Sequence, residues 1–237
     1  MRSTLLAGLL TSVFLTPVVR ADGLIYQLPA NGASVRYDTE TTGSFNGQER
    51  MFKGSVTISS VGEATVDGEK CRWIEIRMMN KRDDQERVSI AKCLIAEKDL
   101  GRGKSPGEHV IRGWLKQGDG EPQAFSDFKS AQGAGRLAGY LAGPPQNPGE
   151  LEKIEIDTPI GKLACPAVTG TRDVEQGNGT TTITFENRLH EKSPFGVVGA
   201  VWKFERKMNG QVVGTGTTRI TLVDTGTTAL SELADRN

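Results

Sequence analysis

Apolar and polar side chains alternate along residues 35–58, on either side of Asn46-Gly47. Successive side chains of a β-strand point to opposite faces, and Asn-Gly favours the two-residue type I′ turn. We therefore expect a hairpin in which Phe45 faces Gln48. One face of this hairpin would carry the pairs Val35 with Ile58, Tyr37 with Val56, and Thr41 with Phe52. The other face would be charged, because an antiparallel sheet often has one buried and one solvated face.

The same pattern recurs over residues 201–218, around Asn209-Gly210. A type I′ turn at this pair again predicts a hairpin. The expected pairs are Met208 with Gln211, Trp202 with Thr217, and Phe204 with Thr215. Gly214 and Gly216 lie within the return strand, where glycine often marks a bulge or a bend. The sheet is therefore expected to curve strongly.

A third hairpin is expected from residues 71–79 and 87–96, with its turn centred near Arg82. This register places Cys71 opposite Cys93 on one face, at a separation that a disulfide can bridge. We expect a disulfide between them, with two unbonded thiols as the alternative. Cys165 is then left over and is expected to be a buried free thiol, which is common for cysteine.

Further strands are expected over residues 63–66, 153–158, 162–172, 180–187 and 219–223. Residues 100–150 are richer in glycine, proline and charge, and are expected to form a helix and loop insertion that crosses or plugs the sheet. Within it, residues 109–116 and 126–141 are predicted to form short helices. The fold class is therefore mainly β: one long curved antiparallel sheet, as a half-barrel or barrel, with one or two short helices from the insertion.

The amino-terminal residues resemble a secretory signal peptide. Arg2 is followed by a mostly apolar run over residues 5–19, and Val19-Arg20-Ala21 has the small-x-small pattern of a peptidase cut. We predict a signal peptide over residues 1–21 and a single β domain over residues 22–237, exported to the periplasm or outside a bacterial cell. The alternative is a buried amino-terminal helix. No later run approaches the roughly 20 apolar residues of a transmembrane helix.

The charge of the mature chain is nearly balanced. Removing Arg2 and Arg20 leaves 27 basic residues against 29 acidic ones. Such a balance gives no broad attraction to nucleic acid, so no nucleic-acid partner is expected. The sequence has no CxxC pair, and only His109 and His190 could add imidazole ligands, so no metal or cofactor is expected.

The motif Asp224-Thr225-Gly226-Thr227 follows two apolar residues and resembles the catalytic turn of pepsin-like aspartic proteases. That chemistry needs two carboxylates that share a proton, each on its own turn. The sequence has no second copy, and only 11 residues follow Gly226. An aspartic-protease-like enzyme that uses Asp224 is therefore a remote alternative, and we expect a protein without catalytic activity.

Two segments carry a resemblance to a family. Residues 157–163, followed by Cys165, contain a Thr-Pro-x-Gly turn, and residues 193–198 lead into the strand of Trp202 and Phe204. This order resembles exported bacterial proteins that are distantly similar to the lipoprotein-localisation (LolA-like) half-barrels. The resemblance implies a curved sheet with an apolar concave face, which holds lipid chains in characterised relatives.

Two functions are compatible with this fold. The first is binding of a hydrophobic or lipid ligand in the curved sheet, with Tyr37, Val56, Trp202 and Phe204 as the candidate cavity-lining residues. The second is a structural or interaction protein of the cell envelope, with a filled core and an envelope protein as its partner.

Overall fold

The computed structural model describes residues 23–82, 85–128, 131, 134–176 and 179–233. The predicted signal peptide, residues 1–21, lies outside these described residues. Eleven strands form one antiparallel sheet in the order β6-β5-β4-β3-β2-β1-β11-β10-β9-β8-β7. The strands are β1 (Ser34–Phe45), β2 (Gln48–Val66), β3 (Glu69–Arg82), β4 (Gln85–Ala96), β5 (Val110–Gln117), β6 (Gln123–Phe125), β7 (Gln146–Thr158), β8 (Gly161–Gln176), β9 (Gly179–Leu189), β10 (Val197–Met208) and β11 (Gln211–Gly226).

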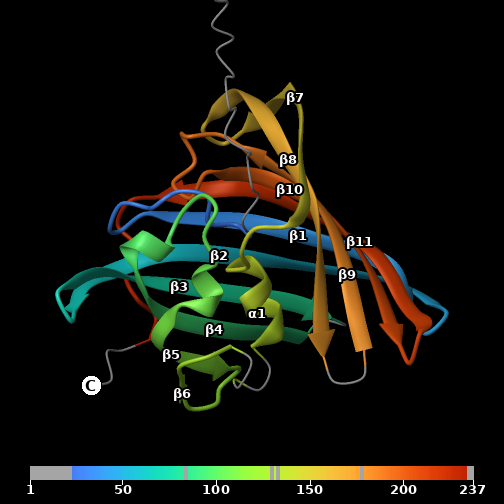
Figure 1. Ribbon diagram of the computed structural model, residues 1–237, viewed down its shortest axis with the longest axis horizontal. Coiled ribbons are helices and arrows are strands. Elements are labelled where there is room, and N and C mark those ends of the chain that lie inside the picture. Colours follow the sequence, from blue (N-terminus) through green and yellow to red (C-terminus); the bar gives the residue numbers. More distant parts are fainter. Residues whose placement is uncertain (1–22, 83–84, 129–130, 132–133, 177–178, 234–237) are drawn as a thin grey trace, which may run out of the picture.

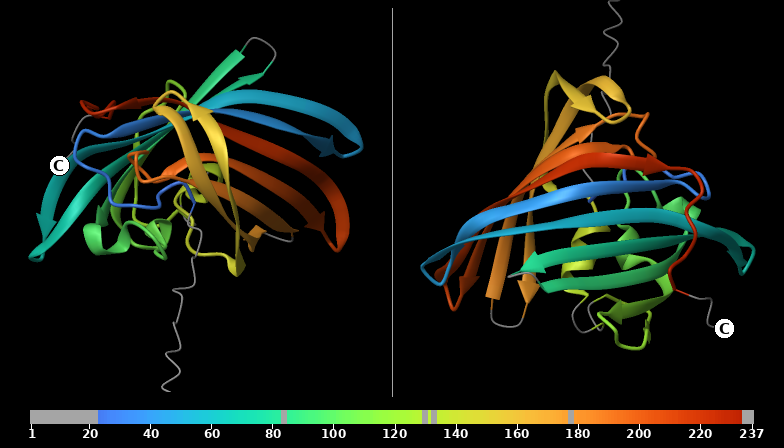
Figure 2. Two further views of the ribbon diagram at one scale, coloured as in Figure 1. Left: turned by 90° about the horizontal axis from the view of Figure 1, so that it is seen from above. Right: turned by 180° about the vertical axis from the view of Figure 1, so that it is seen from behind.

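The long curved antiparallel sheet that the sequence predicted is confirmed, and of the two expected forms, half-barrel and barrel, the structure has the open one. Sequential strands pair from β1 to β6 and from β7 to β11, and the first and last strands, β1 and β11, pair with each other at the centre of the sheet. β6 and β7 are the two edges, so the sheet is a half-barrel and not a closed barrel. Figure 2 shows the sheet arching over the segments that occupy its concave side.

The first Asn-Gly hairpin has the predicted register. Phe45 faces Gln48, Tyr37 faces Val56, and the other expected pairs also occur. Asn46 and Gly47 both have positive φ, as a type I′ turn requires. Tyr37 and Val56 are completely buried on the concave side. The alternation of apolar and polar residues therefore predicted the buried face correctly.

The second hairpin departs from its predicted register by one residue. Met208 faces Gln211, but a bulge follows beside Arg206, so Trp202 faces Thr218 and Phe204 faces Gly216. A Cβ atom on Gly216 would lie 2.6 Å from the ring of Phe204. The glycine therefore provides the space in which the aromatic ring lies against the sheet.

The predicted disulfide is wrong. The β3–β4 register differs by three residues from the expected one, so Cys71 faces Ala96 and Cys93 faces Ile74. An odd shift moves a side chain to the other face of the sheet. Cys71 accordingly packs in a small apolar cluster on the convex face, while Cys93 lies in the concave core. All three cysteines are free.

Residues 100–150 differ from the predicted insertion in one main respect. Residues 110–117 form β5 and not a helix, and β5 with β6 extends the sheet beyond β4. The expected helix over residues 126–141 is reduced to α1 (Gly135–Tyr140). Two short 3₁₀ turns, η1 (Glu97–Asp99) and η2 (Pro106–Glu108), connect β4 to β5. The sheet thus gains strands where a helix was expected.

The concave face is filled at one end by two segments, residues 23–26 and residues 134–142, which we call the plug. The N–H groups of Gly23 and Leu24 donate to the carbonyl oxygens of Ala142 and Tyr140, both at 2.9 Å, and Tyr26 N–H donates to Phe195 O. The largest buried side chains of this region are Leu24, Ile25, Leu137, Leu141 and Phe195, each at most 1 % exposed. The backbone bonds join the plug into one unit, and these side chains form the core with the sheet.

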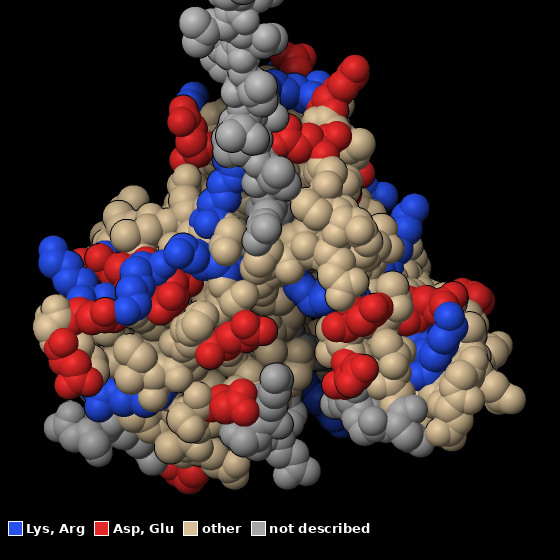
Figure 3. All heavy atoms as spheres, viewed as in Figure 1, with Lys and Arg blue, Asp and Glu red and all other residues tan. Residues whose placement is uncertain are grey.

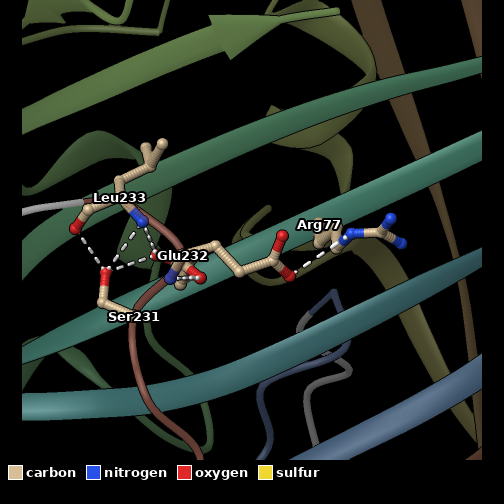
Figure 4. A network of polar contacts seen from close by, with 5 residues as sticks. Arg77, Ser231, Glu232 and Leu233 are labelled. Atoms are coloured by element: carbon tan, nitrogen blue, oxygen red, sulfur yellow. Dashed lines mark hydrogen bonds and ion pairs between the residues drawn. The ribbon is translucent and has the colours of Figure 1, made fainter.

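The carboxyl-terminal tail, residues 227–233, crosses the convex face of β3 and β4 (Figure 2, right). It is anchored on the buried carboxylate of Glu75. Figure 4 shows the tail residues Ser231, Glu232 and Leu233, with the ion pair of Glu232 and Arg77 beside them. Ser231 Oγ donates to Glu75 at 2.7 Å, and the N–H groups of Glu232 and Leu233 donate at 3.0 and 3.4 Å. Lys92, the cross-strand partner of Glu75, donates to Leu233 O at 3.2 Å.

We expect Glu75→Gln to destabilise the fold by about 2–4 kcal/mol, because it weakens three hydrogen bonds and leaves the buried Lys92 without its neighbouring carboxylate. Urea unfolding followed by circular dichroism measures this loss. The matched control is Glu40→Gln, which removes an exposed ion pair with Lys53 and should change the stability by less than about 1 kcal/mol. Equal effects of the two substitutions would contradict the role of Glu75 as the anchor.

Candidate functional site

The concave face is covered by the plug at one end only. Beyond it, the strand ends that carry the Asn46-Gly47 and Asn209-Gly210 turns project past the plug (Figure 1). We call the concave side of these strand ends the open half. Its apolar side chains are only partly buried, in contrast to the core under the plug: they are Phe45, Phe52, Ile183, Trp202 and Phe204. The open half is therefore an apolar surface that the described chain leaves partly exposed, although Trp202 at its border contacts Tyr140 of the plug.

Three phenylalanines form the centre of the open half. The ring of Phe45 lies 5.6 Å from that of Phe52, in an edge arrangement, and 5.7 Å from that of Phe204. These separations are typical of favourable aromatic pairs. The three rings come from β1, β2 and β10, and the sheet holds them in one row.

Beneath these rings the sheet has two positions without side chains, and the neighbouring hydroxyl groups are hydrogen-bonded. Gly43 of β1 faces Gly216 of β11, so two neighbouring positions have no side chain. Next to them, the hydroxyl groups of Thr41 and Thr218 hydrogen-bond to each other at 2.9 Å. A hydroxyl that already has a partner costs little to cover with an apolar group, so this surface can accept apolar atoms.

Trp202 and Asn187 form the boundary between the open half and the plug. The indole ring of Trp202 lies 5.6 Å from the ring of Tyr140 in the plug. Trp202 Nε1 donates to Asn187 Oδ1 at 2.9 Å, and Asn187 Nδ2 donates to Gly23 O at 2.9 Å. Asn187 is 1 % exposed, so this buried amide links the wall of the open half to the plug.

The four predicted cavity-lining residues lie in two different environments. Tyr37 and Val56 are core residues, and the Tyr37 hydroxyl donates to Val197 O at 2.9 Å. Burial raises the pKa of Tyr37 well above its ordinary value, so it stays a neutral donor. Trp202 and Phe204 lie in the open half. That any of the four contacts a ligand stays a prediction.

Phe45, Phe52 and Ile183 also belong to the site, although they were not among the predicted cavity-lining residues. Phe52 faces Thr41 on the face that the first hairpin assigned as apolar, and Phe45 lies on that same face. The register therefore contained this signal. Ile183 faces Phe204 across the β9–β10 pair, and only the pairing of these two strands reveals it.

Figure 3 views the molecule from the concave side. A hollow separates the part that carries α1 from the projecting strand ends of β8 and β9, and basic atoms are visible inside it. The hollow lies where the plug ends.

The groups that catalysis would use are not arranged as an active site requires. Asp224 is exposed near the end of β11, faces Arg36 across the β1–β11 pair, and accepts a bond from Thr225 N–H at 2.9 Å. Its cross-strand neighbour is thus a cation and not the second carboxylate of a protease dyad. Among the described residues, no three potential metal ligands gather. Burial raises the pKa of the Cys93 and Cys165 thiols, which makes them weak nucleophiles.

No helix in the described part of the chain is long and apolar enough to cross a bilayer. No family model matches the sequence, and no curated protein matches it either.

Two solved structures are similar in outline. One is a β-barrel-like protein from Brucella abortus, of a domain of unknown function; it is 8 % identical, with 85 % of this chain and 98 % of that one covered and a TM-score of 0.23. The other is a putative outer membrane lipoprotein-sorting protein domain from Vibrio parahaemolyticus, 10 % identical, with 85 % and 88 % covered and a TM-score of 0.24. At these TM-scores neither similarity supports a functional assignment.

Asn187→Ala should destabilise the protein by about 1–3 kcal/mol, because it leaves Gly23 O and the Trp202 indole N–H without their partner. It should also shift the tryptophan emission, since the boundary of the open half loosens. Urea unfolding followed by both fluorescence and circular dichroism measures the two effects. Thr184→Ala, on the opposite face of the same strand and exposed, is the matched control. If Asn187→Ala behaves like this control, the buried amide does not hold the plug.

Proposed function

We propose that this chain is an exported, non-catalytic protein of the cell envelope that binds a hydrophobic or lipid ligand on the open half of its concave face. The observation that carries the proposal is the row of partly exposed aromatic rings, Phe45, Phe52 and Phe204, beyond the end of the plug. Exposed large apolar side chains that form a contiguous group often mark a ligand or partner site, whereas single ones do not.

The dimensions of the open half agree with an acyl chain. From Thr39 to Phe45 the strand advances six residues, which at about 3.4 Å each is roughly 20 Å. One leaflet of a bilayer provides about half of a hydrocarbon core that is ~30 Å thick. A single extended acyl chain can therefore lie along this surface.

The expected affinity is moderate. Each methylene removed from water contributes about 0.8 kcal/mol, so ten methylenes contribute roughly 8 kcal/mol before the cost of association is subtracted. Dissociation constants in the micromolar range or weaker are the reasonable target for measurement.

A second function is favoured by a different observation. The covered half of the concave face is filled by side chains such as Leu24, Leu137 and Phe195, each at most 1 % exposed. A filled core is what a structural or interaction protein of the envelope would have, with the aromatic row as its contact to an envelope protein. Uptake of a small apolar probe distinguishes the two functions.

Phe204→Ser should weaken binding of the neutral probe N-phenyl-1-naphthylamine about tenfold or more, because it removes one of the three rings. Fluorescence titration measures the dissociation constant. The matched control is Met51→Ser, which changes an apolar side chain that is 61 % exposed and faces the convex side, and it should leave binding unchanged. Absence of probe binding by the unaltered protein, or equal binding by Phe204→Ser, would contradict the carrier proposal.

Export is supported by the signal-peptide pattern of residues 1–21. A cut after Ala21 would leave Gly23, the first hydrogen-bonded residue of the plug, within the mature chain. Expression of the full chain in a bacterial host should therefore give a protein that begins at Asp22 and is released with the periplasmic fraction, as intact-mass measurement shows. The double substitution Val19→Arg and Ala21→Arg should block the cut. A cytosolic protein that retains Met1 would favour the alternative of a buried amino-terminal helix.

A further inference from the structure

The charged side chains of the open half are distributed unevenly between the two faces of the sheet. Strand pairing assigns the faces, because directly opposed residues share a face. Arg50 faces Gly43 and Arg206 faces Gly214, and both glycines lie on the concave face of their strands, because Gly43 is two residues from Phe45 and Gly214 faces Phe45. By the same criterion, Arg87 faces Asn80 and Arg172 faces Ile183 on the concave side. Four arginines therefore lie on the concave side of these strand ends, and one of them, Arg172, donates to Gly143 O and lies over the ring of Phe185.

The carboxylates of the same strand ends face the other way. Glu49 faces Ser44 and Glu205 faces Thr215. Each of these carboxylates is adjacent in sequence to a concave residue and therefore points to the convex face. The convex carboxylates at these levels are Glu40, Glu49, Glu86, Asp173, Glu175 and Glu205. Among the described residues of these strand ends, the concave side carries arginines and no carboxylate.

This separation is local, because the chain as a whole has 29 basic and 29 acidic residues. On the convex side the two signs neutralise each other, as in the ion pair of Glu205 with Lys207 at 2.9 Å. On the concave side, neither Arg87 nor Arg206 forms an ion pair with a described residue. A concave surface lined by one sign of charge attracts a ligand group of the opposite sign.

Two of these arginines lie next to the aromatic row. A Cβ atom built on Gly214 would lie 3.6 Å from the ring of Phe45 and 4.0 Å from Arg206 Cβ, so ring and arginine flank the same glycine. Arg50 lies two residues before Phe52 on the same face, and its Nη2 donates to Gln48 Oε1 at 2.6 Å. This bond holds the guanidinium beside the turn that ends the row.

We propose that the ligand is an anionic amphiphile, whose acyl chain lies on Phe45, Phe52 and Phe204 and whose carboxylate or phosphate head group is bound by Arg50 and Arg206. This inference rests on the proposed carrier function and specifies its ligand. Guanidinium groups match both head groups through paired N–H donors. A neutral lipid with the same chain would gain the apolar contacts but not these bonds.

The test compares three ligands of one chain length: dodecanoate, dodecyl phosphate and dodecanol. Each displaces N-phenyl-1-naphthylamine from the full-length mature protein at pH 8 and low salt. One or both anions should bind about tenfold or more tightly than dodecanol, and the preference should shrink as salt is added. Which anion binds more tightly distinguishes a fatty-acid ligand from a phospholipid-like one.

The double variant Arg50→Gln and Arg206→Gln should lose this preference while it still binds dodecanol. The matched control is Lys203→Gln with Arg219→Gln, which removes the same charge from exposed convex positions of β10 and β11 and should keep the preference. If dodecanol binds the unaltered protein as tightly as both anions, the head-group inference is wrong and the carrier function stands. If the probe itself does not bind, the carrier function fails and this inference falls with it.

Discussion

The structure depends on how a strongly curved sheet buries its concave face. Leu24 and Ile25 from the start of the described chain, together with Leu137 and Leu141, fill this face at one end only. Backbone bonds from Gly23 and Leu24 to Ala142 and Tyr140 join the two segments. Because the strands of the two Asn-Gly hairpins run past the plug, the apolar face continues where nothing in the described chain covers it.

This division gives each part of the sheet a separate task. The covered half, with its buried side chains and the Asn187 amide, provides stability. On the convex face, the tail bound to Glu75 does the same for β3 and β4. The side chains of the open half are only partly buried, and in the proposed function they provide the binding surface. Its aromatic rings and the arginines beside them combine an apolar surface with a positive border, the complement of an amphiphile with a negative head group.

The sequence predicted the fold class and the first hairpin, because alternation and the Asn46-Gly47 turn both fix the register of these strands. It failed where register depends on details without a local pattern. The bulge beside Arg206 shifts the partner of Trp202 by one residue, from Thr217 to Thr218. The turn after β3 is centred later than expected, which shifts the partner of Cys71 by three residues, from Cys93 to Ala96. Val110 and Trp114 are four residues apart, which fits a helix, yet they lie in β5. The site itself could be predicted only in part, because the plug joins segments more than 100 residues apart.

Photo-crosslinking with a long-chain fatty acid that carries a diazirine near its methyl end tests the central claim most directly, when the labelled residues are mapped by tandem mass spectrometry. We expect labels on β1, β2 and β10, in the peptides that contain Phe45, Phe52 and Phe204, and we expect excess dodecanoate to prevent this labelling. Labels confined to the convex face, or no labelling at all, would contradict the assignment of the open half as a ligand site.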